Sequence, residues 1–503
     1  MKRLAFILCF CAFPFIAMQA QDSFDDILKS AMQEFNAVVK GARDEYQKVR
    51  EEADREYAQA IKEAWDEYSA FKAIEAPKEK PVVPVKYEKK EQQQPSRKLP
   101  VKENRVVEAP KPKKVVPVAV PLPVEEKEDP SAFVPVKKEE QVALHRFSFY
   151  GSQLEVAAGA EHKFTLRSLS EENIANAWAS LGHEKYKGLL ESCLKVRSSE
   201  NMCDWAYLTM LNKLSDSLFG GRCNESTMLA AYLFAQSGYK MRLAKNGSTL
   251  YLLYATNYTV FSKNYWKVDG DSYYLYDGNA TSVNICRAKY DKEQSMSMQM
   301  TKSPHFVVKK TGNRALASKR YPEAAVSVCA NKNLLEFFND YPAAGIGNEK
   351  WTVHANAPMS AEVKATLYPT LKKAIAGKSE IDAINCLLNF VQTAFAYEYD
   401  DKVWGEDRVF FAEETLYYPY ADCEDRSILF ARLVRDLLGL DVVLLHYTGH
   451  LATAVKCKQR QQGDYVTVGA ANYLVCDPTY INAPAGNSMP GVEQMSVTVI
   501  KLN

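Results

Sequence analysis

The chain has 503 residues, of which 47% are hydrophobic and 25% charged, and its 63 basic side chains nearly balance its 62 acidic ones. A net charge of +1 excludes a broad polyanion-binding surface as the main property of the chain, so we expect no nucleic-acid partner. The length allows two or three domains, and 11 cysteines are too few for a small disulfide-stapled fold.

Residues 1–20 have the pattern of a cleaved secretory signal peptide. Lys2 and Arg3 precede an apolar run from Leu4 to Met18, and Ala20 supplies a small residue at its end. The run is short and one-sided for a spanning helix, and an uncleaved anchor is the alternative. We expect a secreted, periplasmic or cell-surface protein without a transmembrane segment in the mature chain. Nine cysteines remain after cleavage, so at least one thiol is unpaired within the chain.

Residues 21–76 are predicted to form one long amphipathic, coiled-coil-like helix. Apolar residues from Phe24 to Phe71 recur with a mean spacing of about 3.6, the period of a nearly straight helix. The seam is rich in alanine and tyrosine and is therefore weak. Two arrangements stay open: the helix forms a homo-oligomer through residues 22–75, or it rests on another surface.

Residues 77–140 are predicted to be a Pro-rich linker. They hold 12 of the 22 prolines and no glycine. Segments such as Pro81-Val-Val-Pro favour neither a regular helix nor a central strand. We expect an extended, semi-rigid spacer.

From residue 143 the composition becomes globular, with α+β patterning. The segment 359–503 carries the residues that point to chemistry. Ser379 and Asp382 form a plausible capping box, and Ala421-Asp-Cys-Glu-Asp-Arg-Ser opens an amphipathic helix that Gly439 ends. Three strands are expected after this helix: 440–447, 449–455 and 473–480.

Cys423, His450 and Asp477 form a candidate nucleophilic triad within this pattern. Cys423 falls in the first turn of the helix, where unpaired N–H groups and the helix dipole stabilise a thiolate and can donate to an oxyanion. His450 opens a strand and is the natural acceptor of the thiol proton. Asp477 ends a strand that can pair with the strand of His450 and orient the imidazole.

Each of these residues also has a structural interpretation. Cys423 could be a buried structural cysteine, although its charged neighbours argue against an apolar core position. His450 could be a satisfied structural histidine with His446 as the competing base, and Asp477 could be a turn residue.

Two further expectations follow from the same pattern. If His450 faces Asp477, Cys476 lies opposite Leu451 and too far from Cys457 for a disulfide. Asp425 and Arg426 are interpreted as a local ion-pair network rather than as reactants.

The motif order resembles that of the transglutaminase-like superfamily, whose core is a papain-like α+β fold. The resemblance covers roughly residues 360–490, through Asp-Cys-Glu-Asp, Gly-His-Leu-Ala-Thr-Ala-Val and Cys-Asp-Pro-Thr-Tyr. It implies Cys423 as nucleophile, His450 as general base and acid, and Asp477 as orienting carboxylate, with no cofactor and no metal ion. It also implies acyl transfer at an amide through a thioester, to water or to an amine.

Residues 143–280 repeat the pattern in weaker form. Cys223 and Asp277 are 54 residues apart, as are Cys423 and Asp477. No histidine stands where the base should recur, and serine cannot replace an imidazole in acid–base chemistry. We expect a degenerate transglutaminase-like copy here, with coincidence within a generic α+β domain as the alternative. A connecting segment, 281–358, would separate it from the catalytic domain.

The sequence therefore predicts an exported cysteine-dependent amide hydrolase or acyltransferase that acts on proteins or peptides. The alternative is a non-catalytic surface or periplasmic binding protein whose papain-like domains serve as recognition scaffolds. Reactivity of the Cys423 thiol distinguishes the two hypotheses.

Overall fold

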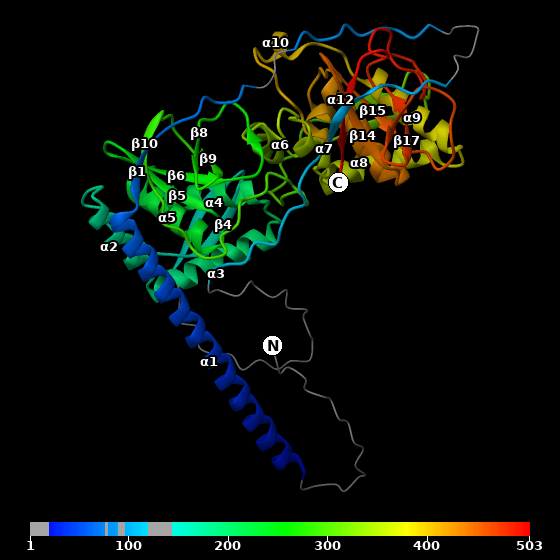
Figure 1. The fold of residues 1–503 in the computed structure, drawn as a ribbon. Helices are drawn as coiled ribbons and strands as arrows, with labels where there is room; N and C mark the ends of the chain where they lie inside the picture. Colours follow the sequence, from blue (N-terminus) through cyan, green and yellow to red (C-terminus); the bar gives the residue numbers. More distant parts are fainter. Residues whose placement is uncertain (1–19, 76–78, 89–95, 119–142) are drawn as a thin grey trace.

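The computed structural model describes residues 20–75, 79–88, 96–118 and 143–503. Two α+β halves lie side by side, each with a largely antiparallel sheet, and a long helix projects from the first half (Figure 1). The predicted signal peptide lies outside the described residues except for Ala20. Within the described ranges, no helix is long and apolar enough to cross a membrane.

The long helix α1 (Ala20–Glu63) packs on the first half through its C-terminal turns. Asp54 is buried there and accepts hydrogen bonds from the hydroxyls of Tyr232 (3.0 Å) and Tyr290 (2.6 Å). Further from the body, Phe35 is 68% exposed. The end of the helix thus rests on the chain's own surface, whereas self-association through its projecting part stays a prediction.

The helix is shorter than the sequence predicts. α1 ends at Glu63, and β1 (Trp65–Ser69) pairs with β10 (Ser282–Cys286). Trp65 Nε1 donates to the carbonyl of Ile61 (2.6 Å), which satisfies an acceptor at the end of the helix. The prediction of one helix over 21–76 is therefore wrong after Glu63, because pairing with the sheet outweighs the apolar period.

The first half is built on a six-stranded sheet in the order β1-β10-β5-β6-β9-β8, with α5 packed across β5 and β6. A separate hairpin, β3–β4, packs against the helices. The elements are α2 (Glu171–Leu181), α3 (Glu184–Ser199), α4 (Asp204–Phe219), α5 (Asn224–Gln236), the 3-10 turn η1 (Ala160–His162), β3 (Leu144–Phe149), β4 (Ser152–Ala157), β5 (Met241–Asn246), β6 (Thr249–Ala255), β7 (Thr259–Val260), β8 (Tyr265–Val268) and β9 (Asp271–Leu275).

The boundary expected at residue 280 is displaced, because β10 belongs to the first sheet. The connecting segment then crosses to the second half, and its strand β13 pairs back with β7. Its elements are β11 (Arg314–Ala317), β12 (Ala325–Val328), α6 (Lys332–Asn339), β13 (Ala344–Gly345) and α7 (Thr352–Asn356).

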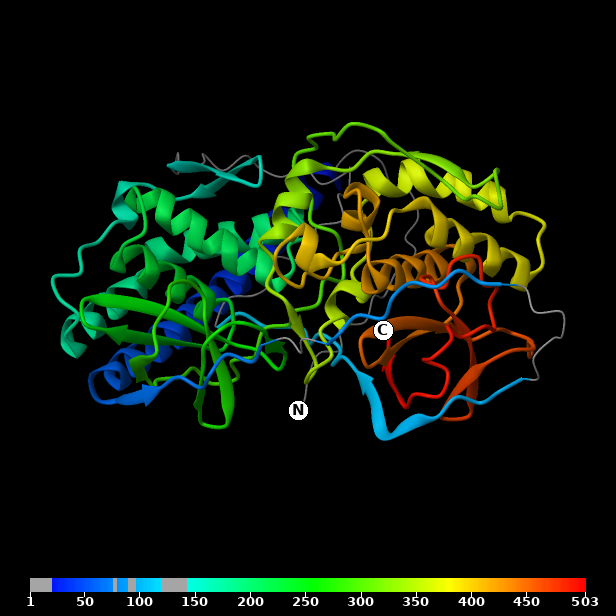
Figure 2. The ribbon, with the colours of Figure 1, turned by 90° about the horizontal axis from the view of Figure 1, so that it is seen from above.

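The second half has a sheet in the order β16-β17-β15-β14-β18-β2. Its helices gather on one side of this sheet, and β2 lies at the outer edge (Figure 2). The elements are α8 (Ala361–Ile375), α9 (Glu380–Ala394), α10 (Asp400–Val403), α11 (Ala412–Tyr417), α12 (Cys423–Leu438), β14 (Val442–Tyr447), β15 (His450–Val455), β16 (Tyr465–Val468), β17 (Ala471–Cys476) and β18 (Val497–Lys501).

The two large sheets share one strand order. Read from the edge strand β1, the first sheet runs β10-β5-β6-β9-β8, and read from β2, the second runs β18-β14-β15-β17-β16. In each half a helix, α5 or α12, precedes the central hairpin and packs on it. The edge strands differ, because β1 pairs antiparallel with β10 whereas β2 pairs parallel with β18.

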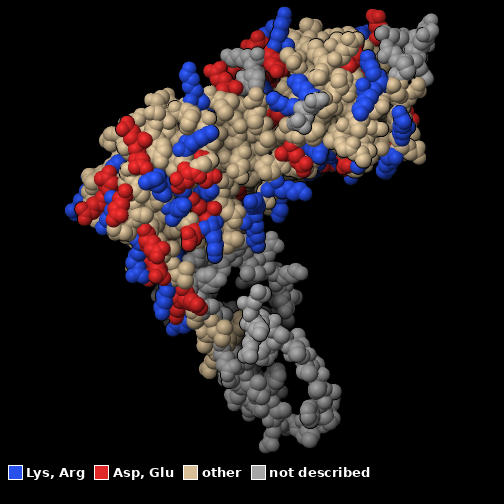
Figure 3. Space-filling view, in the orientation of Figure 1, with Lys and Arg blue, Asp and Glu red and all other residues tan. Residues whose placement is uncertain are grey.

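The described parts of the Pro-rich segment are not a free spacer. β2 (Val101–Glu108) joins the second sheet, and Arg97 forms an ion pair with Asp464 at 2.7 Å. Further along, Val118 N donates to the carbonyl of Gln236 in the first half (2.8 Å). The spacer prediction for 77–140 is wrong for these residues, because main-chain pairing and tertiary contacts hold them. Acidic and basic side chains are interspersed over the visible face of both halves (Figure 3).

The turn after α5 provides a test of this docking. Gly238 has φ +91°, and a Cβ there would lie 2.1 Å from the carbonyl oxygen of Val116. Gly238→Ala should destabilise the protein by about 1 kcal/mol, because alanine is strained in the left-handed backbone conformation. The loss should be larger in total, because the new Cβ also displaces the linker at Val116. Gly247→Ala (φ +57°, with open space at the Cβ) should show the backbone cost alone. Equal shifts of the urea midpoint in Gly238→Ala and Gly247→Ala would contradict the packing of the linker against Gly238.

Candidate active site

Helix α12 places Cys423 at its first residue. Asp422 is the N-cap, and its carboxylate accepts from the N–H groups of Glu424 (3.0 Å) and Asp425 (3.4 Å). Gly439 ends the helix at φ +65°, as the sequence predicts. The N–H of Cys423 has no hydrogen-bond acceptor among the described residues, and it is therefore available to a ligand.

Two side chains of α12 fix the helix start against its surroundings. Arg426 is buried and donates to the carbonyls of Ala421 (3.2 Å), Gln392 (3.1 Å) and Phe395 (2.9 Å). Asp425 accepts instead from the N–H of Phe410 (3.0 Å). The interpretation of Asp425 and Arg426 as a local ion-pair network is therefore wrong, because both side chains bind backbone groups.

His450, the first residue of β15, meets Asp477, which directly follows β17. His450 Nε2 lies 2.9 Å from Asp477 Oδ2, and both side chains are almost fully buried. The other carboxylate oxygen of Asp477 accepts from the N–H groups of Thr479 (2.8 Å) and Tyr480 (3.2 Å). Gln392 Nε2 on α9 donates to the Asp477 carbonyl (3.0 Å) and so positions this turn from the helix side.

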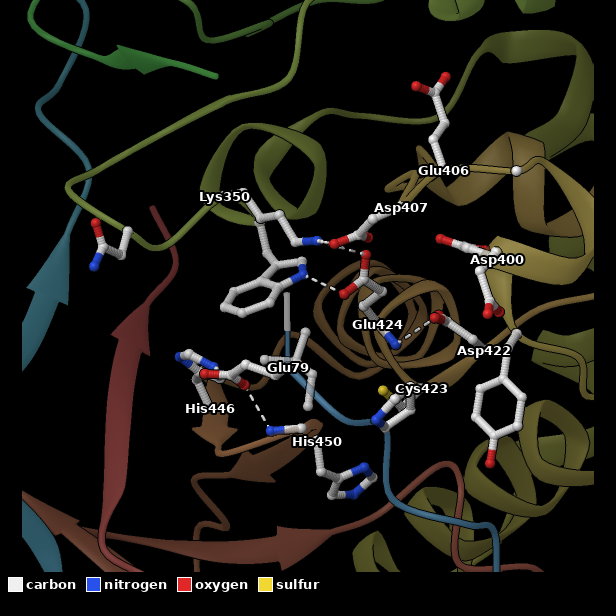
Figure 4. Close-up of a pocket in the computed structure, with 18 residues that line it drawn as sticks. Glu79, Lys350, Asp400, Glu406, Asp407, Asp422, Cys423, Glu424, His446 and His450 are labelled. Carbon is white, nitrogen blue, oxygen red and sulfur yellow. Dashed lines mark hydrogen bonds and ion pairs between the residues drawn. The ribbon is translucent and has the colours of Figure 1, made fainter. Parts of the chain in front are cut away.

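The free ring nitrogen of His450 is the feature that links it to Cys423. His450 Nδ1 is buried and has no hydrogen-bond partner among the described residues. Cys423 and His450 line the same cavity of about 440 Å³ (Figure 4). No hydrogen bond joins the two side chains, whereas Ser427 of α12 donates to the Leu451 carbonyl (2.9 Å) and ties the helix to the strand of His450. The structure thus brings the three predicted residues to one site.

The environment of the thiol differs from the expected one. Burial raises the pKa of Cys423 well above its ordinary value, and the carboxylates of Asp422 and Glu424 raise it further. The N–H of Leu451 opposes this shift. The helix terminus alone favours a thiolate, but burial, together with the carboxylates on both sides of the cysteine, outweighs it.

One wall of the cavity is acidic. Burial raises the pKa of Asp422 to about 7, with the Asp400 charge adding to it, and raises the pKa of Glu424 to about 8. Lys350 forms an ion pair with Asp407 and lies 3.6 Å from Glu424 Oε1. The lining residues are Glu79, Pro81, Asn348, Lys350, Trp351, Tyr399, Asp400, Asp401, Gly405, Glu406, Asp407, Asp422, Cys423, Glu424, His446, Gly449, His450 and Leu451.

Three of these carboxylates also have the spacing of metal ligands. One oxygen each of Asp400, Asp407 and Glu424 lies within 4.8 Å of the others. The ammonium of Lys350 already stands beside two of them, so a side chain of the protein supplies positive charge to this cluster.

His446, the competing base, also reaches the cavity. Its Nδ1 lies 2.7 Å from Glu349 and its Nε2 lies 3.3 Å from Glu79. Burial alone would lower the pKa of His446, but these two carboxylates raise it. With both nitrogens beside carboxylates, His446 is less suited than His450 to accept a proton from the thiol.

Among its described residues, the first half has no equivalent arrangement of thiol, imidazole and carboxylate. Asn224 stands at the first residue of α5, and its Oδ1 accepts from the N–H of Leu250 (2.9 Å) at the start of β6. Cys223 is the N-cap and accepts from the N–H of Ser226. Asp277 is mostly exposed beside Arg222. No imidazole of the described residues contacts Asn224, Cys223 or Asp277.

Sequence reasoning missed several parts of the site. Glu79 and Pro81 come from the Pro-rich segment, and Lys350 and Trp351 come from the connecting segment. No local motif marks these four residues, and only the folded chain brings them to Cys423. The register is also shifted: Cys476 pairs with Thr453 rather than with Leu451. All nine cysteines of the described residues are free.

Glu424→Gln tests the acidic wall. The pKa of about 8 lies above the ordinary 4.5, so stability is lost as the pH rises between these values. The free energy of unfolding, measured in urea, should fall in the wild type between about pH 5 and about pH 8. In Glu424→Gln this fall should be smaller, by about 1 kcal/mol or more. The exposed Glu336→Gln should keep the wild-type decline. An unchanged decline in Glu424→Gln would show that this carboxyl titrates normally.

No family model, no curated protein and no solved structure significantly matches this chain. The resemblance to the transglutaminase-like superfamily therefore depends on the residues and contacts described above.

Proposed function

We propose that this protein is an exported cysteine-dependent enzyme that cleaves or transfers acyl groups at amide bonds of proteins or peptides. The main support for the proposal is the hydrogen bonding of the two ring nitrogens of His450. Asp477 holds its Nε2, while its Nδ1 stays unpaired and the ring lines the same cavity as the thiol of Cys423. An imidazole that a carboxylate orients, and that lines the same cavity as a thiol at a helix start, supplies the three parts of a nucleophile–base–orienter set.

The reaction follows from these groups. His450 Nδ1 takes the thiol proton as Cys423 Sγ attacks the amide carbon, and the N–H of Cys423 donates to the oxyanion that forms. The carbon–nitrogen bond then breaks, and the imidazolium gives its proton to the leaving amine. Water or a second amine attacks the thioester, His450 accepts the proton of this nucleophile, and the proton returns to the sulfur as the thioester breaks. Asp477 stabilises the imidazolium throughout.

The charge of the cavity favours a substrate with a positive group near the amide. Seven carboxyl side chains line it, against a single lysine and two histidines. Burial raises the pKa of Asp400 and Asp422 to about 7 and that of Glu424 to about 8, so these three carry only part of their charge at neutral pH, and the excess of negative charge comes chiefly from the other four. Such an excess of one sign attracts and orients groups of the opposite sign. A lysine or arginine residue, or an amine acceptor, fits this wall better than an acidic substrate does.

The papain-like identity of the second half and its duplication belong to the same proposal. The shared strand order of the two sheets supports descent from one domain. In the first half, Asn224 at the helix start and the missing histidine are compatible with a copy that has lost catalysis. We propose that this half serves as a binding or supporting module, and that the protein is exported.

One observation favours the alternative of a non-catalytic binding protein. The pKa of Cys423 is raised, and its sulfur forms no hydrogen bond with His450. Catalysis then requires His450 to remove the proton during attack, rather than a thiolate present beforehand. Measured turnover decides between the two functions.

Hydrolysis and aminolysis of a mixed peptide library, followed by mass spectrometry, test the enzyme directly. Cys423→Ala and His450→Ala should each lower kcat/KM at least about a thousandfold, and Asp477→Asn by about a hundredfold or more. Cys457→Ala, a free cysteine outside the cavity, should retain wild-type turnover. Turnover that survives Cys423→Ala would exclude the thiol mechanism.

The acidic wall predicts a charge preference. Amide substrates flanked by lysine should have a kcat/KM about tenfold above that of otherwise identical glutamate peptides, and added salt should reduce the difference. Asp401→Asn should reduce this difference in kcat/KM, whereas Glu336→Gln, outside the cavity, should leave it unchanged. A preference for the glutamate peptides would contradict the inferred substrate charge.

A further inference from the structure

Four residues of the Pro-rich segment, Glu79 to Val82, lie against the turn that carries His450; we call them the strap. Glu79 Oε2 accepts from the N–H of Gly449 (2.6 Å) and lies 3.3 Å from His446 Nε2. Val82 N donates to the carbonyl of Gly449 (3.0 Å). The strap thus binds both backbone polar groups of the residue directly before His450.

The turn is shaped for this contact. Gly449 has φ +74°, and a Cβ there would lie 2.1 Å from the carbonyl oxygen of Lys80. Only glycine combines this backbone conformation with so close an approach of another chain segment. The strap and the turn are therefore fitted to each other along the main chain.

The chain directly after the strap is anchored as well. Tyr87 N donates to the carbonyl of Ile481 (2.8 Å), and Ile481 N donates to the carbonyl of Val85 (3.0 Å). The Tyr87 ring packs edge-on against Tyr480, with centroids 5.5 Å apart. Tyr480 follows Asp477 closely, and its N–H donates to the Asp477 carboxylate. The described segment 79–88 thus spans from the turn of His450 to the turn of Asp477.

The strap also forms part of the cavity surface. Glu79 and Pro81 line the cavity together with Cys423 and His450, and Figure 4 shows Glu79 between His446 and the thiol. A peptide in this cavity cannot pair with Gly449, because the strap already occupies its N–H and carbonyl groups. The acidic side that carries Asp400 and Asp407 remains for the substrate.

We propose that Glu79 is a positioning residue of this active site, and that the strap fixes the turn at Gly449 so that His450 faces Cys423. This inference deepens the proposed function and rests on it for its catalytic consequence. A turn next to a catalytic base must be held within about 0.5 Å, and glycine in a two-residue turn does not supply that rigidity by itself. The Glu79 carboxylate supplies it through a charge-assisted hydrogen bond to the turn.

Glu79→Ala removes the acceptor, whereas Glu79→Gln keeps an acceptor for the Gly449 N–H and loses only the charge. Glu79→Ala should lower kcat by about 10- to 100-fold and should slow alkylation of Cys423 by iodoacetamide, whereas KM should rise only slightly, because six other carboxyl groups of the cavity remain. Glu79→Gln should recover most of the kcat. Arg97→Ala, which removes a linker anchor at Asp464 outside the cavity, should leave kcat and KM unchanged.

Hydrogen–deuterium exchange of the full chain provides a readout independent of turnover. Exchange at residues 448–451 should rise in Glu79→Ala and stay at the wild-type level in Arg97→Ala. Unchanged exchange at this turn in Glu79→Ala would contradict the proposed role of Glu79. Raised exchange with an unaltered kcat, in an enzyme whose wild type is active, would contradict it as well. If the wild type shows neither turnover nor Cys423 alkylation that depends on His450, the proposed function fails, while exchange still decides whether Glu79 holds the turn.

Discussion

The buried hydrogen bond between His450 and Asp477 is the interaction on which the site depends. A buried carboxyl group is costly unless hydrogen-bond donors surround it. Asp477 has such donors in two backbone N–H groups and the imidazole. Because Nε2 is committed to Asp477, only Nδ1 is left for the cavity. The strand pairing of β15 with β17 therefore determines which nitrogen can act as a base.

The acidic neighbours of Cys423 give the proposed reaction a particular character. Asp422 and Glu424 oppose a thiolate, and they flank the sulfur along the helix. A substrate cation in the cavity would offset these charges and lower the pKa of the thiol. In the proposed enzyme, binding of a positive group and activation of the nucleophile are then linked. This linkage would keep the thiol protonated, and less reactive toward oxidants, while the cavity is empty.

The second half could be predicted well from the sequence where signals are local. The cap at Ser379, the stop at Gly439 and the strands around His450 follow from neighbouring residues, and the structure has them close to the expected places. The strand β2 and the contact between Glu79 and Gly449 could not be predicted. Their partners lie hundreds of residues away, and proline-rich composition normally indicates a chain without sheet pairing.

The comparison of the two halves separates what the architecture needs from what the chemistry needs. In the first half the side chain at the start of α5, Asn224, binds the N–H of Leu250 at the start of β6. In the second half Cys423 stands at the start of α12, and the N–H of Leu451, near the start of β15, opposes the rise of its pKa. Both halves thus place a polar side chain at the helix start, close to the beginning of the second strand of the central hairpin. A thiol can replace the amide at this position without loss of the architecture, but only the half with an oriented histidine has the base that the proposed reaction needs.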